Sequence, residues 1–258
     1  MKQYLVDAFT DKIFHGNPAA VCVMDNWLDE ELMQNIAKEN NLSETAFIVK
    51  ESSVYKLRWF TPKEEINLCG HATLAAAFVI LNYYDKSTDT VTFNTISGEI
   101  TVCRRGELYE MNFPTYDFKE IAVTDEMAQA FGVRPVKAVL SMDLICIFDS
   151  IDTINNMTPN MEIVESLPGR LQNVTTRGQD VDCVTRTFAP KCGIIEDPVC
   201  GSAHCQVAKY WSEVLGKKNI TAYQASKRGG TLYCELQDNQ RINISGKAVL
   251  FAVSELMI

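Results

Sequence analysis

The stretch Cys69-Gly-His-Ala-Thr-Leu-Ala-Ala-Ala-Phe-Val-Ile-Leu81 decides the fold. From His71 onward it is apolar on nearly every side, and a helix of this kind must be buried all round. Since most of the neighbouring segments have the pattern of short strands, we expect a barrel-like sheet to wrap around this helix. The apolar run 72–81 is too short to cross a membrane, which takes on the order of 20 residues.

A second helix of the same kind is predicted over Ser202–Leu215, with Gly216 ending it. Both helices are preceded by one pattern, R-x-F-x-P-K followed by C-G-x-A, which occurs twice about 130 residues apart. An internal duplication explains these seven matched identities better than chance does. We therefore expect two pseudo-symmetric domains, 1–117 and 118–258, each a mainly antiparallel sheet around its own helix, with the final strand as a candidate to cross back to the first half.

The remaining periodicity predicts an α+β protein with many short strands and few helices. Further helices are expected over Trp27–Glu39 with Leu28, Leu32 and Ile36 on its inner face, over Asp125–Phe131, and over Pro159–Ser166. Strands are expected at Tyr4–Phe9, Ala20–Val23, Thr45–Val49, Val54–Phe60, Val91–Asn94, Ile100–Arg104, Leu108–Phe113, Ala138–Leu140, Ile145–Phe148, Thr231–Gln237 and Arg241–Leu256, the last interrupted by Gly246.

Composition excludes several functions. The 258 residues include 24 Lys+Arg and 33 Asp+Glu, a formal charge of −9, which argues against nucleic acid as a partner. The apolar share of 47% is that of a folded globular protein, and the N-terminus lacks the apolar run of a secretion signal. Nine cysteines with no C-x-x-C pair are a poor disulfide framework, so reduced thiols and a cytoplasmic location are expected.

The duplicated motif places Cys69 and Cys200 at two helix starts, where backbone N–H groups and the helix dipole attract a carboxylate. Two such thiols could flank one substrate carbon and racemise it without a cofactor, since a helix start is expected to lower a thiol pKa. The alternative is that both are small core residues. A metal site from Cys69, His71, Cys200 and His204 is disfavoured because C-x-H and C-x₃-H match no usual zinc pattern.

Three other residues are candidates for chemistry. Glu44 stands alone in a neutral run before an apolar strand, so it is either partly desolvated and suited to acid/base work or a solvated strand end. His71 lies in the first turn of a buried helix, as a functional group or as a core histidine bonded to a carbonyl. Asp197 could orient a histidine, hold a substrate amine or cap a turn.

Together, several segments resemble the PhzF-like family of phenazine biosynthesis, in the order of that family and from the N-terminus to the C-terminal third. These segments are Val6-Asp-Ala-Phe-Thr10, Phe14-His-Gly-Asn-Pro-Ala-Ala-Val21, Asn41-Leu-Ser-Glu-Thr-Ala-Phe47, Cys69-Gly-His-Ala-Thr73 and Glu196-Asp-Pro-Val-Cys-Gly-Ser-Ala-His204. The resemblance implies the diaminopimelate-epimerase fold, with two pseudo-symmetric halves and the site between them.

The resemblance also implies residue roles. The catalytic set would be Glu44, His71, Asp197 and Ser202, with Glu44 moving a proton between two carbons of the substrate without any cofactor or metal. Substrate-binding positions would be Asn17, Ser43, Gly70, Ala72, Gly201 and Ala203. The expected ligand is a small-molecule carboxylate, neither nucleic acid nor membrane is a partner, and exposed strands are compatible with a homodimer.

One departure from the family pattern keeps the mechanism open. Cys200 stands where PhzF-like proteins more often have threonine, whereas their epimerase and racemase cousins have cysteines at both helix starts. The chain thus holds the glutamate of an isomerase and, in Cys69 and Cys200, a second acid/base pair. The complete Asn-Leu-Ser-Glu-Thr motif favours glutamate chemistry, with a two-cysteine epimerase or racemase and a non-catalytic binding protein as the alternatives.

Overall fold

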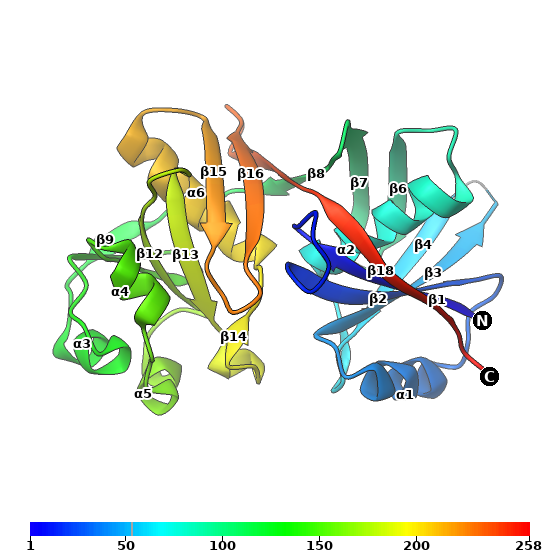
Figure 1. Ribbon diagram of the computed structural model, residues 1–258, viewed down its shortest axis with the longest axis horizontal. Coiled ribbons are helices and arrows are strands. Elements are labelled where there is room, and N and C mark those ends of the chain that lie inside the picture. The colour runs from blue at the N-terminus through cyan, green and yellow to red at the C-terminus, as the bar shows by residue number, and fades with distance from the viewer. Residues whose placement is uncertain (53) are drawn as a thin grey trace. The chain divides into compact units, whose positions relative to one another are not determined.

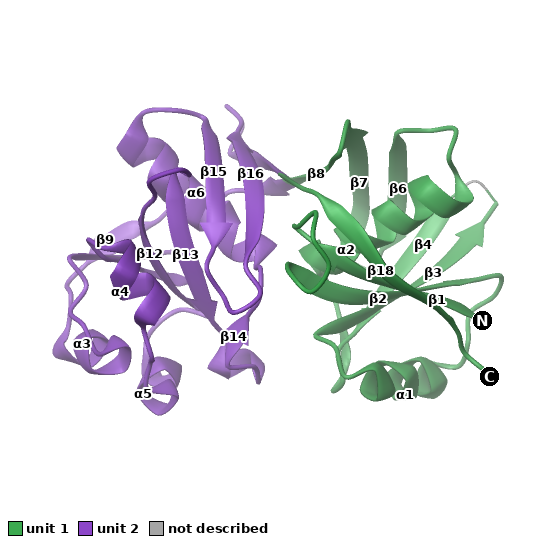
Figure 2. Ribbon diagram, viewed as in Figure 1, with its two compact units in different colours: residues 1–112, 245–258 green, residues 113–244 purple. Residues whose placement is uncertain are grey.

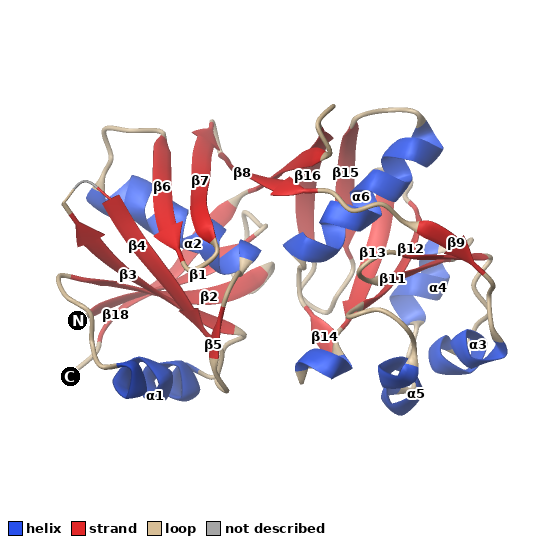
Figure 3. Cartoon of the chain, turned by 180° about the vertical axis from the view of Figure 1, so that it is seen from behind, coloured by secondary structure: helices blue, strands red, loops and turns tan. Residues whose placement is uncertain are grey.

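The computed structural model describes residues 1–52 and 54–258 and divides them into two compact units (Figures 1 and 2). The first unit comprises Met1–Asn112 and Ser245–Ile258, and the second comprises Phe113–Ile244. The chain therefore passes from one unit to the other after Asn112, compared with the predicted break near residue 117, and its last strand belongs to the first unit. Strands outnumber helices in both units, as the α+β prediction required (Figure 3).

The first unit is a sheet with one helix inside it and one on its surface. Its helices are α1 (Glu30–Asn40) and α2 (Gly70–Val79), the latter extended by a π-helical turn over Ile80–Tyr84. Its strands are β1 (Lys2–Ala8), β2 (Asn17–Met24), β3 (Glu44–Glu51), β4 (Val54–Phe60), β5 (Glu65–Ile66), β6 (Thr90–Thr95), β7 (Gly98–Arg105), most of β8 (Leu108–Pro114) and β18 (Ala248–Glu255).

The second unit has more helices. They are α3 (Asp125–Phe131), α4 (Ile151–Asn156), α5 (Met161–Ser166) and α6 (Gly201–Leu215), with a 3-10 turn over Pro190–Cys192. Its strands are β9 (Lys119–Ile121), β10 (Lys137–Leu140), β11 (Leu144–Ile147), β12 (Gln172–Arg177), β13 (Cys183–Phe188), β14 (Glu196–Asp197), β15 (Asn219–Gln224), β16 (Gly230–Leu236) and most of β17 (Arg241–Gly246).

Strand pairing follows one scheme in both units. In the first, β18, β1, β2, β3, β4, β6, β7 and β8 are successive neighbours, and only β2–β3 and β4–β6 are parallel. In the second, β9, β10, β11, β12, β13, β15 and β16 follow in the same way, and only β11–β12 and β13–β15 are parallel. In the first unit β1 thus pairs with β18 from the opposite end of the chain, whereas its counterpart in the second unit, β10, pairs with β9 from the N-terminal end of that unit.

The repeated motif has the same structure in each copy. Arg58 donates two hydrogen bonds to Glu65, both 2.6 Å long, and Arg186 donates two to Glu196 at 2.8 and 2.9 Å. Each guanidinium also lies over the phenylalanine two residues further on, at 5.2 and 5.0 Å from the ring centre. Matching contacts in matching registers are what an internal duplication predicts.

Helix α2 is buried as the sequence predicted. Every residue from His71 to Ala77 is buried, because the helix packs against β1, β2 and β3. Helix α6 packs against β12, β15 and β16, and it exposes its outer face over Glu213 and Val214. Both helices begin with a Cys-Gly pair whose cysteine is the N-cap residue in an extended conformation.

Several predicted elements need correction. Helix α1 begins at Glu30 rather than Trp27, and Leu32 is 36% exposed, so the inner face is formed by Met33, Ile36 and Ala37. Helix α5 begins at Met161, because the Asn160 side chain accepts hydrogen bonds from the backbone N–H groups of Glu162 and Ile163, so the predicted Pro159 start is wrong. Strands β12, β13 and β15 and helix α4 were not predicted.

The two chain ends meet in the first unit. The Met1 amino group donates a hydrogen bond to the Leu256 carbonyl at 2.9 Å, and the Leu256 N–H donates to the Met1 carbonyl at 2.8 Å. Among the described residues, no helix has the length and apolar character needed to span a membrane.

Candidate active site

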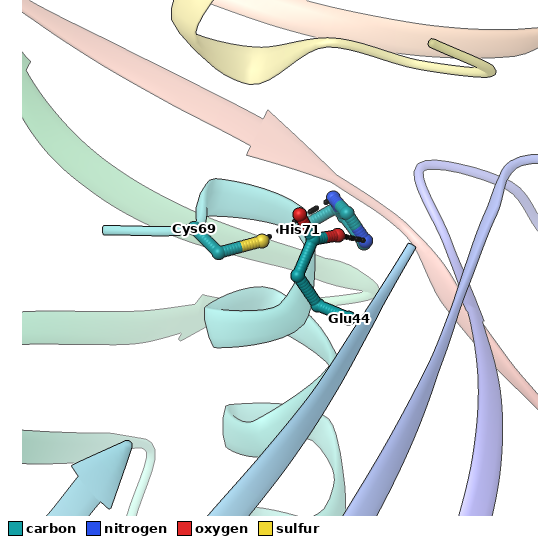
Figure 4. A group of neighbouring side chains, drawn as sticks. All are labelled: Glu44, Cys69 and His71. Carbon is teal, nitrogen blue, oxygen red and sulfur yellow. Dashed lines mark hydrogen bonds and ion pairs between the residues drawn. The ribbon is translucent and has the colours of Figure 1, made fainter. Parts of the chain in front are cut away.

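The start of α2 brings together three chemically active side chains, Glu44, Cys69 and His71 (Figure 4). Glu44 is the first residue of β3, Cys69 is the N-cap of α2, and His71 lies in its first turn. The His71 imidazole lies between the other two groups, with Nε2 3.1 Å from Glu44 Oε2 and Nδ1 3.5 Å from Cys69 Sγ. Asn17, at the start of β2, places its side-chain Nδ2 3.2 Å from the same Nδ1.

The contact between Glu44 and His71 is nearly shielded from water. The side chains are 16% and 7% exposed, and neither Glu44 Oε2 nor His71 Nε2 has a hydrogen-bond partner among the described residues, so their ion-pair contact is the interaction that compensates them. A buried charge of either sign is unfavourable unless it is paired. The geometry therefore favours a carboxylate and an imidazolium that stabilise one another.

The pKa of His71 agrees with a protonated imidazole. Burial lowers the pKa of His71, but its contacts with Cys69 and with the Glu44 carboxylate raise it more, so the net pKa lies well above 6.5. Burial and the nearby Glu44 charge raise the pKa of Cys69, so this group is a neutral thiol near pH 7. Glu44 is thus the neighbour whose negative charge keeps His71 protonated.

The same cluster has the residue types of a metal site. One ligand atom from each of Glu44, Cys69 and His71 lies within 4.8 Å of the others. The thiol faces Nδ1 and the carboxylate faces Nε2, so the two groups approach different nitrogens of the imidazole ring. The other two residues of the metal site considered from the sequence are Cys200 and His204. His204 Nδ1 faces the Cys200 carbonyl oxygen at 2.7 Å. Burial lowers the pKa of His204 to about 4, as in a neutral core histidine.

The start of α6, in the second unit, gathers the remaining predicted catalytic residues. Ser202 Oγ lies 3.4 Å from Cys200 Sγ. Asp197 closes a turn by accepting a hydrogen bond from the Val199 N–H at 3.1 Å. The buried Gln224 side chain joins these segments, since it accepts from the Cys200 N–H at 2.8 Å and donates to the Asp197 carbonyl at 2.6 Å.

Two charged residues that the sequence did not single out also belong to this helix start. Arg170 Nη2 donates a hydrogen bond to Ser202 Oγ at 2.9 Å, and Arg170 Nε lies 3.3 Å from Asp143 Oδ1. Neither residue lies in a recognisable motif. The only local signal is the Pro168-Gly169 turn that precedes Arg170, and a turn alone does not indicate a binding residue.

The pKa values of the Cys69 and Cys200 thiols differ from what the sequence led us to expect. A helix start was expected to lower their pKa, but burial raises the pKa of Cys200 well above 9.0, with a further contribution from the Asp197 charge. Cys69 shifts in the same direction. The expectation is wrong because desolvation of a buried thiolate outweighs the attraction of the first-turn N–H groups.

The predicted substrate-binding positions surround the same two helix starts. In the first unit, Ser43 directly precedes Glu44, and Gly70 and Ala72 lie in the first turn of α2. In the second, Gly201 and Ala203 occupy the first turn of α6. Neither N-cap residue has a side-chain oxygen to accept hydrogen bonds from first-turn N–H groups, which suits a helix start that receives an anion.

Comparison with known proteins gives consistent matches over nearly the whole chain. The family model PhzC-PhzF, described as phenazine biosynthesis-like protein, matches residues 6–254. An uncharacterized isomerase of Pseudomonas aeruginosa is 44% identical over 248 residues, which is 96% of this chain and 95% of that protein. A crystal structure of a PhzF-family protein from Enterococcus faecalis has 46% identity and a TM-score of 0.97, covering 100% of this chain and 99% of that one.

A more distant structure shares the fold alone. It is a predicted epimerase from Pseudomonas aeruginosa with 21% identity and a TM-score of 0.75, covering 100% of this chain and 99% of that chain. The epimerase-like fold expected from the sequence is thereby confirmed.

Proposed function

Because the chain belongs to the phenazine biosynthesis-like PhzC-PhzF family, we propose that it is an isomerase that moves a proton within a small carboxylate-bearing metabolite. Glu44 is the general acid/base of this proposal, and no cofactor takes part. The isomerase class is supported by the similarity to the uncharacterized isomerase of Pseudomonas aeruginosa. The residue assignment rests on the site itself.

The observation that carries the assignment is the 3.1 Å contact between Glu44 Oε2 and His71 Nε2 in a nearly buried position. In this contact the Glu44 carboxylate faces a cation, and a carboxylate can accept a proton from a substrate. The Glu44 side chain retains 16% exposure, so part of it remains accessible to a small molecule. A base that is paired on one side and accessible on the other suits reversible proton transfer.

The reaction then needs no oxidant or other co-reactant. Glu44 would take a proton from one carbon of the substrate, and the electron pair left behind would delocalise toward the neighbouring unsaturated group. Glu44, which is partly exposed, would exchange this proton with solvent and deliver a proton to a different carbon, so the product is an isomer and the carboxylate is regenerated. His71 would remain protonated throughout and would stabilise the Glu44 anion before and after transfer.

The substrate carboxylate would be bound by helix-start N–H groups. Those near Gly70 in the first unit and near Gly201 and Ser202 in the second are candidates, because backbone N–H groups and the helix dipole favour an anion. Asp197 would hold a substrate amine.

The raised thiol pKa values favour Glu44 over the two cysteines. A two-thiol racemase requires one thiolate near neutral pH, whereas burial raises the pKa of both Cys69 and Cys200. The neutral thiol of Cys69 and the cationic His71 leave Glu44 as the anionic member of the first helix start.

Deuterium incorporation tests this proposal directly. The protein would be incubated in D₂O with a panel of amino acids and cyclic amino acids, and products would be analysed by mass spectrometry. We expect incorporation into at least one of them, lost in Glu44→Gln and retained in Glu51→Gln, a matched change at the exposed far end of the same strand. We also expect Cys200→Ser to retain incorporation.

Two outcomes would contradict the proposal. Loss of incorporation in Cys200→Ser but not in Glu44→Gln would support the two-cysteine epimerase or racemase. Binding of a carboxylate without incorporation in any variant or in the parent protein would support a binding protein that retains the fold without the chemistry.

A further inference from the structure

The second helix start contains a buried carboxylate that the proposed chemistry does not use. Asp143, just before β11, is completely buried. Its Oδ1 accepts a hydrogen bond from the Leu171 N–H at 3.2 Å, and its Oδ2 accepts one from Gln206 Nε2 at 2.7 Å. The Asp143 N–H in turn donates to Gln206 Oε1 at 3.0 Å, so the carboxylate is held from several sides.

Arg170 is the cation that pairs with this carboxylate. Its Nε lies 3.3 Å from Asp143 Oδ1, and the Arg170 side chain is still 45% exposed. Burial lowers the pKa of Arg170, but the charge and hydrogen bond of Asp143 raise it more, so the group stays cationic. Because Asp143 is completely buried, the exposed side of this pair is the positive one.

The guanidinium has donors to spare. Nε faces Asp143 and Nη2 donates to Ser202 Oγ, and Nη1 has no hydrogen-bond partner among the described residues. A planar guanidinium with free N–H groups matches the two oxygens of a carboxylate. The Ser202 contact places these donors at the first turn of α6, where the backbone N–H groups also favour an anion.

The turn that carries Arg170 is held in place. Lys191 donates hydrogen bonds to the carbonyls of Leu167 and Gly169, at 2.5 and 2.7 Å. Gly169 has a φ of +85°, and a Cβ added there would lie 2.4 Å from the Leu144 backbone nitrogen, so no larger residue fits. A fixed turn is what an arginine needs in order to be pre-positioned for a ligand.

The internal duplication shows that this charge pair is specific to the second unit. In the first copy Thr45 pairs with Phe60, and in the second Gln172 pairs with Phe188, so Gln172 is the counterpart of Thr45. Counting back along the sequence from this pair, Leu171 is the counterpart of Glu44 and Arg170 is the counterpart of Ser43. Likewise, the β2–β3 and β11–β12 registers put Asp143 in the place of Ala19. One helix start thus carries an acid/base glutamate, and the other carries a cation on a buried anchor.

From this arrangement we propose that Arg170, anchored by Asp143 and joined to Ser202, binds the carboxylate of the substrate and determines the preference for anionic substrates. This inference rests on the proposed function, because it assigns the carboxylate of that substrate to the start of α6. It adds a side-chain cation to a helix start that otherwise offers backbone N–H groups and the Ser202 hydroxyl.

Binding of benzoate and of its neutral analogue benzamide tests the inference without requiring turnover. Affinities would be measured by calorimetry for the parent protein and for Arg170→Gln, Arg170→Lys and Arg177→Gln. Arg177 is an exposed arginine of the same unit, so its replacement gives the same change in net charge. Urea unfolding of each variant would establish that it is folded.

We expect the parent protein and Arg177→Gln to bind benzoate more tightly than benzamide. Arg170→Gln should weaken benzoate binding at least about tenfold and leave benzamide binding unchanged, because only the anion uses the guanidinium. Arg170→Lys should have an intermediate effect, since it keeps the charge but not the planar pair of donors.

Two results would overturn the inference. One is a folded Arg170→Gln variant that binds benzoate as tightly as Arg177→Gln, and the other is a parent protein that does not distinguish benzoate from benzamide. Neither of these binding results depends on Glu44. Failure of the proposed proton transfer and failure of this carboxylate site can therefore be told apart.

Discussion

His71 illustrates how much one side chain depends on its neighbours. Its imidazole contacts Glu44 through one nitrogen and lies near Cys69 and Asn17 at the other. Without Glu44, burial alone would favour the neutral ring. The charge state of His71 is therefore a property of the cluster, and it contributes to the stability of the fold.

This coupling predicts a pH dependence of stability. The folded pKa of His71 is raised above 6.5, so the stabilisation from its protonation is fully present below about pH 6.5 and is lost as the pH rises through the folded pKa. We expect the free energy of unfolding in urea to fall as the pH rises above about 6.5. In the Glu44→Gln variant the free energy of unfolding should fall less steeply with pH. An equal slope in both proteins would contradict the inference that Glu44 keeps His71 protonated.

The cysteines give a second prediction at the scale of single residues. Cys192 is exposed, whereas Cys69 and Cys200 are buried with raised pKa values, so iodoacetamide near pH 7 should modify Cys192 first and the other two far more slowly. Peptide-resolved mass spectrometry would measure the rates. Cys22 is the matched control, a buried thiol outside the site whose pKa burial raises to about 12. Modification of Cys200 much faster than Cys22 would indicate an activated thiol.

The sequence could indicate those site residues that lie in a local motif, but not those that become neighbours only in the folded chain. Glu44, His71 and Ser202 were indicated because each lies in a short motif next to a helix or strand start. Arg170 and Asp143 were not indicated, because they become neighbours only through strand register and the turn at Gly169. A buried aspartate and an exposed arginine that are 27 positions apart leave no local signature in one sequence.

At the scale of elements, the loop between β1 and β2 controls where Asn17 lies. Gly16 immediately precedes Asn17 and has a φ of +66°. A Cβ at this position would lie 2.1 Å from the Ala8 carbonyl oxygen, so both the backbone conformation and the available space require glycine.

Gly16→Ala should therefore destabilise the protein by several kcal/mol, roughly the cost of strain plus displacement of the loop. Gly132→Ala is the matched control. Gly132 ends α3 with a similar φ of +73°, but nothing lies within 4 Å of its added Cβ, so we expect a cost of only about 1 kcal/mol. Urea unfolding would measure both. Equal costs would show that the close approach to Ala8 is relieved without consequence.

Elements with an apolar pattern were predictable, and those with buried polar residues were not. The all-apolar helix α2 and strands such as β4 were predicted at or near their bounds. Strands β12 and β13 were missed because their buried faces carry Asn173, Thr175, Thr185 and Thr187, which hydrogen bond to one another in two pairs. Hydrophobic alternation cannot reveal a strand whose inner face is polar.

At the scale of the whole molecule, the first unit depends on residues from both ends of the chain. Strand β18 pairs with β1 over nearly its full length, and Lys247, just before it, forms ion pairs with Asp11 and Glu107. Without β18, the edge of β1 would lose a complete ladder of hydrogen bonds. The second unit instead supplies β9 from its own N-terminal end.

Deleting residues 247–258 should therefore unfold the first unit and leave the second folded. Limited proteolysis with mass spectrometry should detect a protected fragment close to 113–244. A chain lacking only Met257 and Ile258, which follow β18 and are exposed, should resist proteolysis as the full chain does. Resistance of residues 1–112 in the longer deletion would contradict the structural role of β18.

The hydrogen bonds between Met1 and Leu256 have a consequence for protein engineering. Since the two termini already lie side by side in one unit, a short peptide linker could join them into a circular backbone without distorting β1 or β18. New termini could then be opened in an exposed turn elsewhere, such as the one at Gly106, giving a circular permutant in which the order of the strands along the chain changes while their neighbours do not.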